Sequence, residues 1–84
     1  MTVTWSETQP AENADKAWYA AAMTSDGSKM LAGVYNGRLY MYSGGSWSET
    51  RPAGDADKYW NFCNMASDGS KMLAGVKDGR LYLY

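Results

Sequence analysis

The chain has 84 residues, with eight Lys and Arg residues against nine Asp and Glu residues, no histidine and one cysteine. This length allows one domain at most. The near-zero net charge argues against the basic surface that a nucleic acid or an anionic membrane would need, so neither is an expected partner. No apolar run reaches the roughly 18 residues of a membrane span, and residues 1–5 do not begin a signal peptide. We therefore expect a soluble protein without a signal peptide, produced by recombinant expression in the cytoplasm, and we assign it no cellular location.

An internal repeat dominates the sequence. Residues 5–42 and 47–84 align without a gap at an offset of 42, and 26 of the 38 aligned pairs are identical. The differences concentrate in residues 17–22 against 59–64, where only Trp18 and Trp60 match. A repeat with a period of this length indicates a fold built from repeated structural units.

The first repeat predicts short strands separated by turns. In chain order these are residues 2–8, 18–24, 29–35 and 38–42, and the next strand covers 46–50. Pro10 and Pro52 end the strands before them, because proline cannot donate a hydrogen bond to a ladder. No stretch of ten or more residues carries the 3.6-residue apolar period of a helix.

The second repeat predicts strands at 60–66, 71–77 and 80–84 in the same way. The tight turns between strands contain Asp-Gly at 26–27 and 68–69, Asn-Gly at 36–37 and Asp-Gly at 78–79. These dipeptides favour hairpins because they supply a positive φ. Gly33 and Gly75 in the middle strands suit positions where sheets pack closely. The polar stretches 11–16 and 53–58 are expected loops.

This pattern predicts an all-β fold, a β-propeller of four-stranded antiparallel blades with two 42-residue repeats per chain. One common class of blade has about 40 to 45 residues. The repeat resembles the sialidase-type, or Asp-box, propeller repeat, in which a turn of Ser, Asp and Gly leads into a tryptophan. Here that turn is Ser43-Gly44-Gly45-Ser46-Trp47, without the aspartate. The near-identity of the repeats also resembles computationally designed symmetric propellers of the Cake type, which implies an engineered scaffold without a selected activity.

The repeats are out of phase with the blades. Residues 1–10 hold a lone fourth strand, residues 18–52 a complete blade, and residues 60–84 the first three strands of another. Since about three or more repeats are usually needed for stability, we expect the chain to assemble with itself. The fourth strand of one copy would complete the blade of the next, head to tail, in a ring of four chains and eight blades or, second, three chains and six blades. The residues expected to close the ring are Thr2, Val3, Thr4, Trp5, Leu81, Tyr82, Leu83 and Tyr84.

Aromatic, polar and basic residues of the two repeats are the candidate ligand-binding residues. They are Trp18, Tyr19, Trp60, Asn61, Arg38 and Arg80. The first four could bind a sugar and the arginines an anion. The structural alternatives are that the tryptophans pack between blades and that the arginines lie at solvated strand ends or pair with Asp26 or Asp68. Because the first strand of each blade is innermost in propellers, Phe62 and Asn64 are expected to line the channel.

Catalysis, cofactor binding and metal binding are not expected, and we assign no residue to them. Cys63 has no histidine base and is interpreted as a small apolar filler. Asp55 and Asp57 are too few for a calcium site. The sialidase resemblance implies an arginine cluster, but this chain has only Arg38, Arg51 and Arg80, two of them at the same repeat position. The expected function is a self-assembling structural scaffold, and the alternative is a multivalent carbohydrate-binding lectin.

Overall fold

The computed structural model describes residues 6–11, 15–52, 54 and 57–84, and every regular element among them is a β-strand. The bounds are β1 (Trp18–Met23), β2 (Met30–Gly37), β3 (Leu39–Ser43), β4 (Ser46–Thr50), β5 (Lys58–Met65), β6 (Met72–Val76) and β7 (Leu81–Leu83). The all-β class is therefore confirmed. Each strand predicted between residues 18 and 84 is found, with both ends within two residues of the predicted positions.

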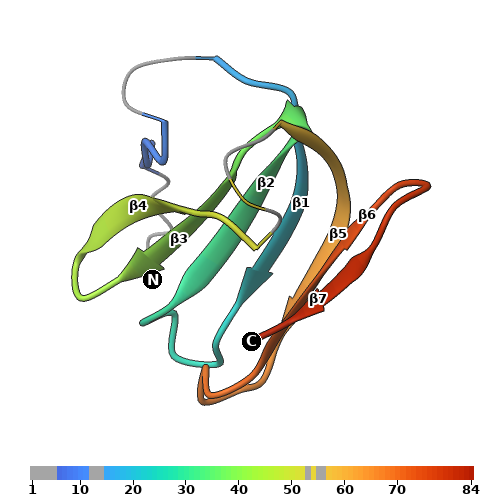
Figure 1. Cartoon of the computed structure of the whole chain (residues 1–84). Coiled ribbons are helices and arrows are strands. Elements are labelled where there is room, and N and C mark those ends of the chain that lie inside the picture. Colours follow the sequence, from blue (N-terminus) through green and yellow to red (C-terminus); the bar gives the residue numbers. More distant parts are fainter. Residues whose placement is uncertain (1–5, 12–14, 53, 55–56) are drawn as a thin grey trace.

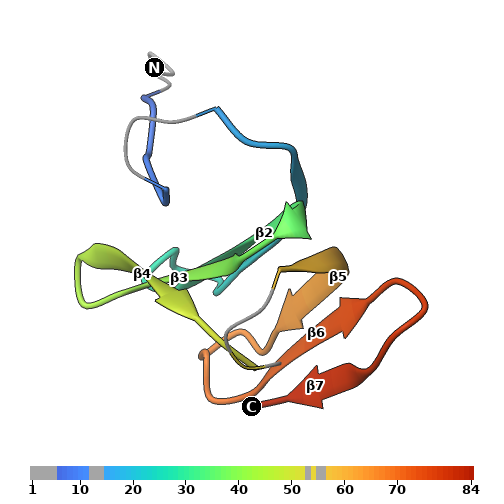
Figure 2. The same cartoon turned by 45° about the horizontal axis from the view of Figure 1, so that its top comes forward.

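The strands form one seven-stranded antiparallel sheet in the order β4-β3-β2-β5-β6-β7, with β1 paired to β2 beside this path (Figure 1). The body of β2 pairs with β1 and β3, and only its end pairs with β5, through Tyr35–Tyr59 and Gly37–Lys58. We call β1–β4 the first unit and β5–β7 the second unit. In Figure 2 the second unit lies below the first as a separate layer.

Strand pairing recurs at the sequence offset of 42. Trp18 lies opposite Val34 between β1 and β2, and Trp60 lies opposite Val76 between β5 and β6. Both hairpins have a register shift directly after the tryptophan, so Tyr19 and Asn61 fall outside the regular pairing. Similar sequences therefore form hairpins with the same register.

The predicted turns are present, and their backbone angles match their composition. Gly27 and Gly69 both have φ of 75°, the left-handed region that suits glycine. In the other two turns Asn36 and Asp78, at φ of 61° and 58°, take the left-handed position themselves. Asparagine and aspartate tolerate this conformation better than other side chains.

The hydrophobic core lies between the two units. It is formed by Leu31 and Leu39 from the first unit and by Trp60, Met72 and Ala74 from the second. Gly33 lets the units approach, because a Cβ atom at this position would lie 2.9 Å from the Cβ atom of Trp60. The close approach predicted for this glycine is confirmed.

The strand predicted at residues 2–8 is not found in its described part. Residues 6–9 have no regular structure, and residues 1–5 lie outside the described residues. A strand needs an edge to pair with, and among the described residues no third strand of another unit lies beside this segment. The predicted strand was expected to pair with another copy, so it stays a prediction for the assembled protein.

Candidate functional site

The most prominent surface feature is exposed apolar side chains on both outer faces of the sheet. Large hydrophobic residues that are well exposed are Trp18, Tyr19, Met23, Tyr59, Phe62, Leu81, Leu83 and Tyr84. Of these, Tyr84 lines a cleft between the two units and Tyr59 contacts Tyr35 inside the chain, so these two do not belong to the outer faces. Extended apolar surface of this kind marks interaction sites in soluble proteins. The candidate functional site is therefore a set of contact surfaces.

The outer face of the first unit points away from the second unit. Side chains alternate between the two faces of a strand, so Ala21 and Met23 of β1 lie on this face with Trp18. The ring of Trp18 makes an edge-to-face contact with Tyr40, with the ring centroids 5.7 Å apart. An open hollow of about 680 Å³ covers this face. Its lining includes Thr8, Pro10, Trp18, Met23, Met30, Ala32 and Trp47.

The outer face of the second unit is the opposite end of the molecule. We define it by the residues Phe62, Asn64, Leu73, Gly75, Leu81 and Leu83, which share one face according to the pairing of β5, β6 and β7. The Phe62 ring lies directly over Gly75, so a Cβ atom at that glycine would collide with the ring. Phe62, expected to line a channel, thus lies on a sheet face, where the backbone of β6 leaves room for it.

Equivalent residues of the two repeats differ sharply in exposure. Leu39 is 2% exposed, whereas its counterpart Leu81 is 61% exposed. Trp60 is 2% exposed, whereas its counterpart Trp18 is 39% exposed. Each unit covers one face of the other unit. The uncovered outer face of each unit therefore carries counterparts of residues that are buried between the units.

The outer edge of β7 is also open. Tyr84 and Met72 exchange two backbone hydrogen bonds, of 2.8 Å and 3.2 Å, which turn the backbone of Tyr84 toward β6. Because antiparallel pairing alternates, the N–H and C=O groups of Leu83 point to the other side. Among the described residues no strand pairs there, whereas the equivalent Met41 of β3 pairs with Ser48 of β4.

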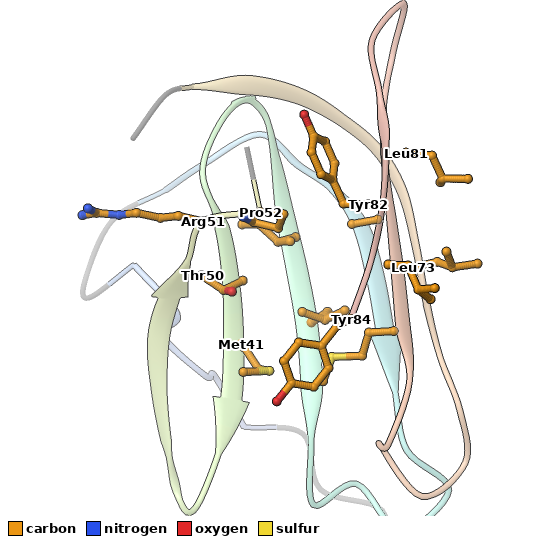
Figure 3. Close-up of a pocket in the computed structure, with 13 residues that line it drawn as sticks. Met41, Thr50, Arg51, Pro52, Leu73, Leu81, Tyr82 and Tyr84 are labelled. Atoms are coloured by element: carbon orange, nitrogen blue, oxygen red, sulfur yellow. The ribbon is translucent and has the colours of Figure 1, made fainter. Parts of the chain in front are cut away.

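A cleft of about 350 Å³ lies between the units (Figure 3). One wall includes Met41, Thr50 and Pro52, and the other includes Tyr82 and Tyr84 of the C-terminal strand region. In Figure 3 the Tyr84 ring points toward Met41. The cleft is therefore mostly apolar. Residues 51–52, which directly follow β4, form part of its border.

The segment before β1 contacts the outer face of the first unit. The indole N–H of Trp47 donates a hydrogen bond of 2.7 Å to the hydroxyl of Thr8. Thr8 and Pro10 line the hollow on this face together with Met30. Thr50 and Pro52, their counterparts at the offset of 42, line the cleft together with Met72, the counterpart of Met30. In Figure 2 the blue segment lies on the side of the first unit opposite to the second unit.

The aromatic and amide candidates for ligand binding do not come together. Trp60 lies in the core, where its indole N–H finds no acceptor among the described residues. Trp18 lies in the hollow of the first unit. Tyr19 and Asn61 are exposed at the two register shifts, in different units. The structure therefore brings no two of these four side chains into one pocket except Trp18 and Tyr19.

Of the two basic candidates, Arg38 has partners that were not predicted, whereas Arg80 lies at a solvated strand end. The Arg38 guanidinium pairs with Glu49 at 3.0 Å and with Asp57 at 2.8 Å. Pairing with Asp26 or Asp68 is thus wrong for Arg38, because Arg38 directly precedes β3, which pairs with β4, and Asp57 directly precedes β5. Arg80 is exposed and has no ion pair within the described parts of the chain.

Cys63 is a half-buried thiol beside the core. Burial raises the pKa of the Cys63 thiol to about 11, so the thiol stays protonated at neutral pH. The thiol packs against the core, as the filler interpretation expects. No cluster of metal-ligating side chains occurs in the described ranges, and Asp55 lies outside them. The described residues also contain no helix that could cross a membrane.

A comparison of the sequence with protein families and with curated proteins finds no match. The contact surfaces are therefore the features from which a function can be inferred.

Proposed function

We propose that this chain is a structural module that assembles with further copies of itself, head to tail, into a closed β-propeller ring. The preferred ring has four chains and eight blades, and the second choice has three chains and six blades. Each chain contributes the first unit as a complete blade. The second unit supplies three strands of the next blade, and a copy of this chain supplies the fourth.

The observation that carries this proposal is the reversal of exposure at equivalent positions. Leu81 and Trp18 are exposed, while their counterparts Leu39 and Trp60 are buried against the other unit. If the outer face of the second unit packs against the outer face of the first unit of another copy, both sets become buried. Burying a large apolar side chain stabilises by about 1.5 to 3 kcal/mol, so several such residues favour association strongly.

Strand completion is supported by the segment before β1. Thr8 and Pro10 line the hollow beside Met30 of the first unit, and Thr50 and Pro52 line the cleft beside Met72, the equivalent residue of the second unit. Since residues 46–50 form β4, the equivalent residues 4–8 are the natural strand to pair with the open edge of β7 in a second copy. The residues proposed for this joint include 1–5, which lie outside the described residues.

The proposal includes no catalytic role. The chain has no histidine to act as a base, and its one thiol is kept protonated by burial. The near-identity of the repeats and their resemblance to designed propellers support an engineered scaffold.

Native mass spectrometry of the full chain tests the proposal. We expect a single species with four times the mass of the chain, or three times for the smaller ring. Deletion of residues 1–9 should abolish this species, because it removes the completing strand. A matched control replaces Thr2, Val3 and Thr4 by Gly, Gly and Ser, the residues that precede Trp47. This variant should still assemble. A folded single chain at micromolar concentration would contradict the proposal.

Carbohydrate binding is the alternative function. Its support is the hollow at Trp18 and Tyr19, where aromatic rings could stack on a sugar. Trp60 is buried and offers no stacking surface in the chain. A glycan array with the assembled protein separates the two functions: reproducible saccharide binding favours a lectin, and its absence favours the scaffold.

A further inference from the structure

The contact inside the chain and the proposed contact between copies use equivalent positions but different residues. The repeats differ most in the strands β1 and β5, where five of the six positions from 17 to 22 differ from those from 59 to 64. Outside this stretch the faces of the two units are almost identical in sequence. The differences therefore fall on the surfaces that would meet in an assembly.

Inside the chain, small residues of β1 face β5. Ala20 is 8% exposed and pairs with Gly33, so both positions lie on the face that the second unit covers. Ala22 lies on the same face, and it packs against the core together with Cys63 of β5. The Trp60 side chain lies against Gly33 on this same face.

Between copies, the equivalent positions carry larger side chains. Phe62 and Asn64 replace Ala20 and Ala22 on the outer face of the second unit. Phe62 is 48% exposed although its ring covers Gly75. On the outer face of the first unit the change is from larger to smaller, because Ala21 stands where the second unit has Cys63. A larger residue on one surface is thus matched by a smaller residue on the other.

A second difference lies at the end of β2. Inside the chain the rings of Tyr35 and Tyr59 contact each other, with centroids 4.7 Å apart, and the two residues also pair through their backbones. Their counterparts are Lys77 and Ala17, which cannot form an aromatic pair. The contact between copies therefore lacks this ring pair and has the Phe62 ring instead.

We propose that Phe62 is the anchor of the contact between copies, where it packs against Ala21 and Trp18 of a second copy of this chain. This inference rests on the proposed function and specifies the surface that carries it. The exchange of sizes makes the contact between copies chemically distinct from the contact inside the chain. The second unit of one copy is thereby directed to the first unit of the next.

Site-specific cross-linking tests which surfaces meet. In a Cys63→Ala background, one chain carries Asn64→Cys and a second chain carries Ala21→Cys, so that any disulfide must join two chains. On mixing and oxidation we expect the 64–21 heterodimer to dominate. In the matched control, the second chain carries Ser46→Cys, at the first residue of β4, in place of Ala21→Cys. This pair should cross-link at least about tenfold more slowly.

The outcomes separate this inference from the proposed function. If native mass spectrometry shows the ring and the 64–21 disulfide forms no faster than the control, the inference is wrong and self-assembly stands. If no oligomer of the unmodified chain is found, the proposed function itself is wrong, and the inference with it.

Removal of the anchor gives a second, independent readout. Phe62→Ala should raise the chain concentration needed for half-maximal assembly by at least about tenfold, as expected for a central aromatic anchor. Tyr59→Ala is the matched control, because Tyr59 is 43% exposed, its ring contacts Tyr35 inside the chain, and it does not line the hollow of the first unit. It should change this concentration by less than about threefold. Equal effects of the two substitutions would overturn the inference.

Discussion

At the level of single residues, the two Ser-Asp-Gly-Ser turns differ through one neighbouring side chain. The Asp26 carboxylate accepts hydrogen bonds from the Ser28 N–H and the Thr24 hydroxyl, both at 3.0 Å. Asp68 accepts from the N–H and hydroxyl of Ser70, but Ala66 stands where the first repeat has Thr24. These hydrogen bonds lower the pKa of both carboxyls, and that of Asp26 falls to about 2.

The lowered pKa of Asp26 predicts that this residue stabilises the fold in a pH-dependent way. Its pKa in the folded chain is below the ordinary value of 3.8, so the stabilisation is present above about pH 4 and is lost as the pH falls toward 2. Asp26→Asn should lower the melting temperature at pH 7 and have little effect at pH 2. Thermal unfolding followed by circular dichroism at both pH values checks this. The control is Asp15→Asn, an exposed carboxyl outside the turns. An Asp26→Asn effect that is the same at both pH values would contradict the expectation.

At the level of elements, the backbone N–H of Leu83 at the open edge of β7 can be tested for its role in pairing with a further strand. The hydrogen bonds between Tyr84 and Met72 leave the N–H of Leu83 directed to the outside of the sheet. Edge strands with free groups of this kind pair with further strands. Inside the chain the same position, Met41 of β3, pairs with β4.

Leu83→Pro is expected to prevent strand addition at β7 while leaving the β6–β7 hydrogen bonds in place, because the N–H that proline removes points outward and does not bond to β6. The assembled species should be lost, or the concentration needed for assembly should rise by at least about tenfold, as measured by sedimentation velocity. Leu83→Ala is the control, since it removes most of the side chain and keeps the N–H. If the alanine variant is as defective as the proline variant, the side chain and not the edge is responsible.

At the level of the whole molecule, the proposed ring predicts how a longer chain behaves. The Tyr42–Ser43 step inside the chain corresponds, at the offset of 42, to a direct link from Tyr84 of one copy to Met1 of the next. A fusion of two copies without a linker should therefore form a ring of the same total mass from half as many chains.

The fused chain should also stay assembled at lower concentration, because part of the association becomes intramolecular, with an effective concentration on the order of millimolar. Native mass spectrometry and dilution series measure both effects. The control is a fusion with one residue deleted at the junction, which changes the face that each strand residue presents. A fused chain whose assembly has twice the expected mass would contradict a closed ring of fixed size.

The sequence was sufficient for the strands between residues 18 and 84. The dipeptides Asn36-Gly37 and Asp78-Gly79 specify tight turns, and the alternation of Leu39, Tyr40 and Met41 specifies a strand with two different faces, so the strands of both repeats could be placed. These signals act within a few residues, which is why they can be read without a structure. The offset of 42 also indicated equivalent surfaces before any of them could be seen.

The tertiary structure decided which equivalent residues are buried. Leu39 and Leu81 lie in two identical copies of the tetrapeptide Gly-Arg-Leu-Tyr. Leu39 is nevertheless covered by the second unit, whereas Leu81 is exposed. The position of Phe62 over Gly75 and the pairing of Arg38 with Glu49 and Asp57 were equally unpredictable from local patterns. Each depends on which sheet face meets another, and that is a property of packing between distant segments. The sequence by itself determined the strands and their repeat, and the three-dimensional packing determined which copies of that repeat remain open for contact.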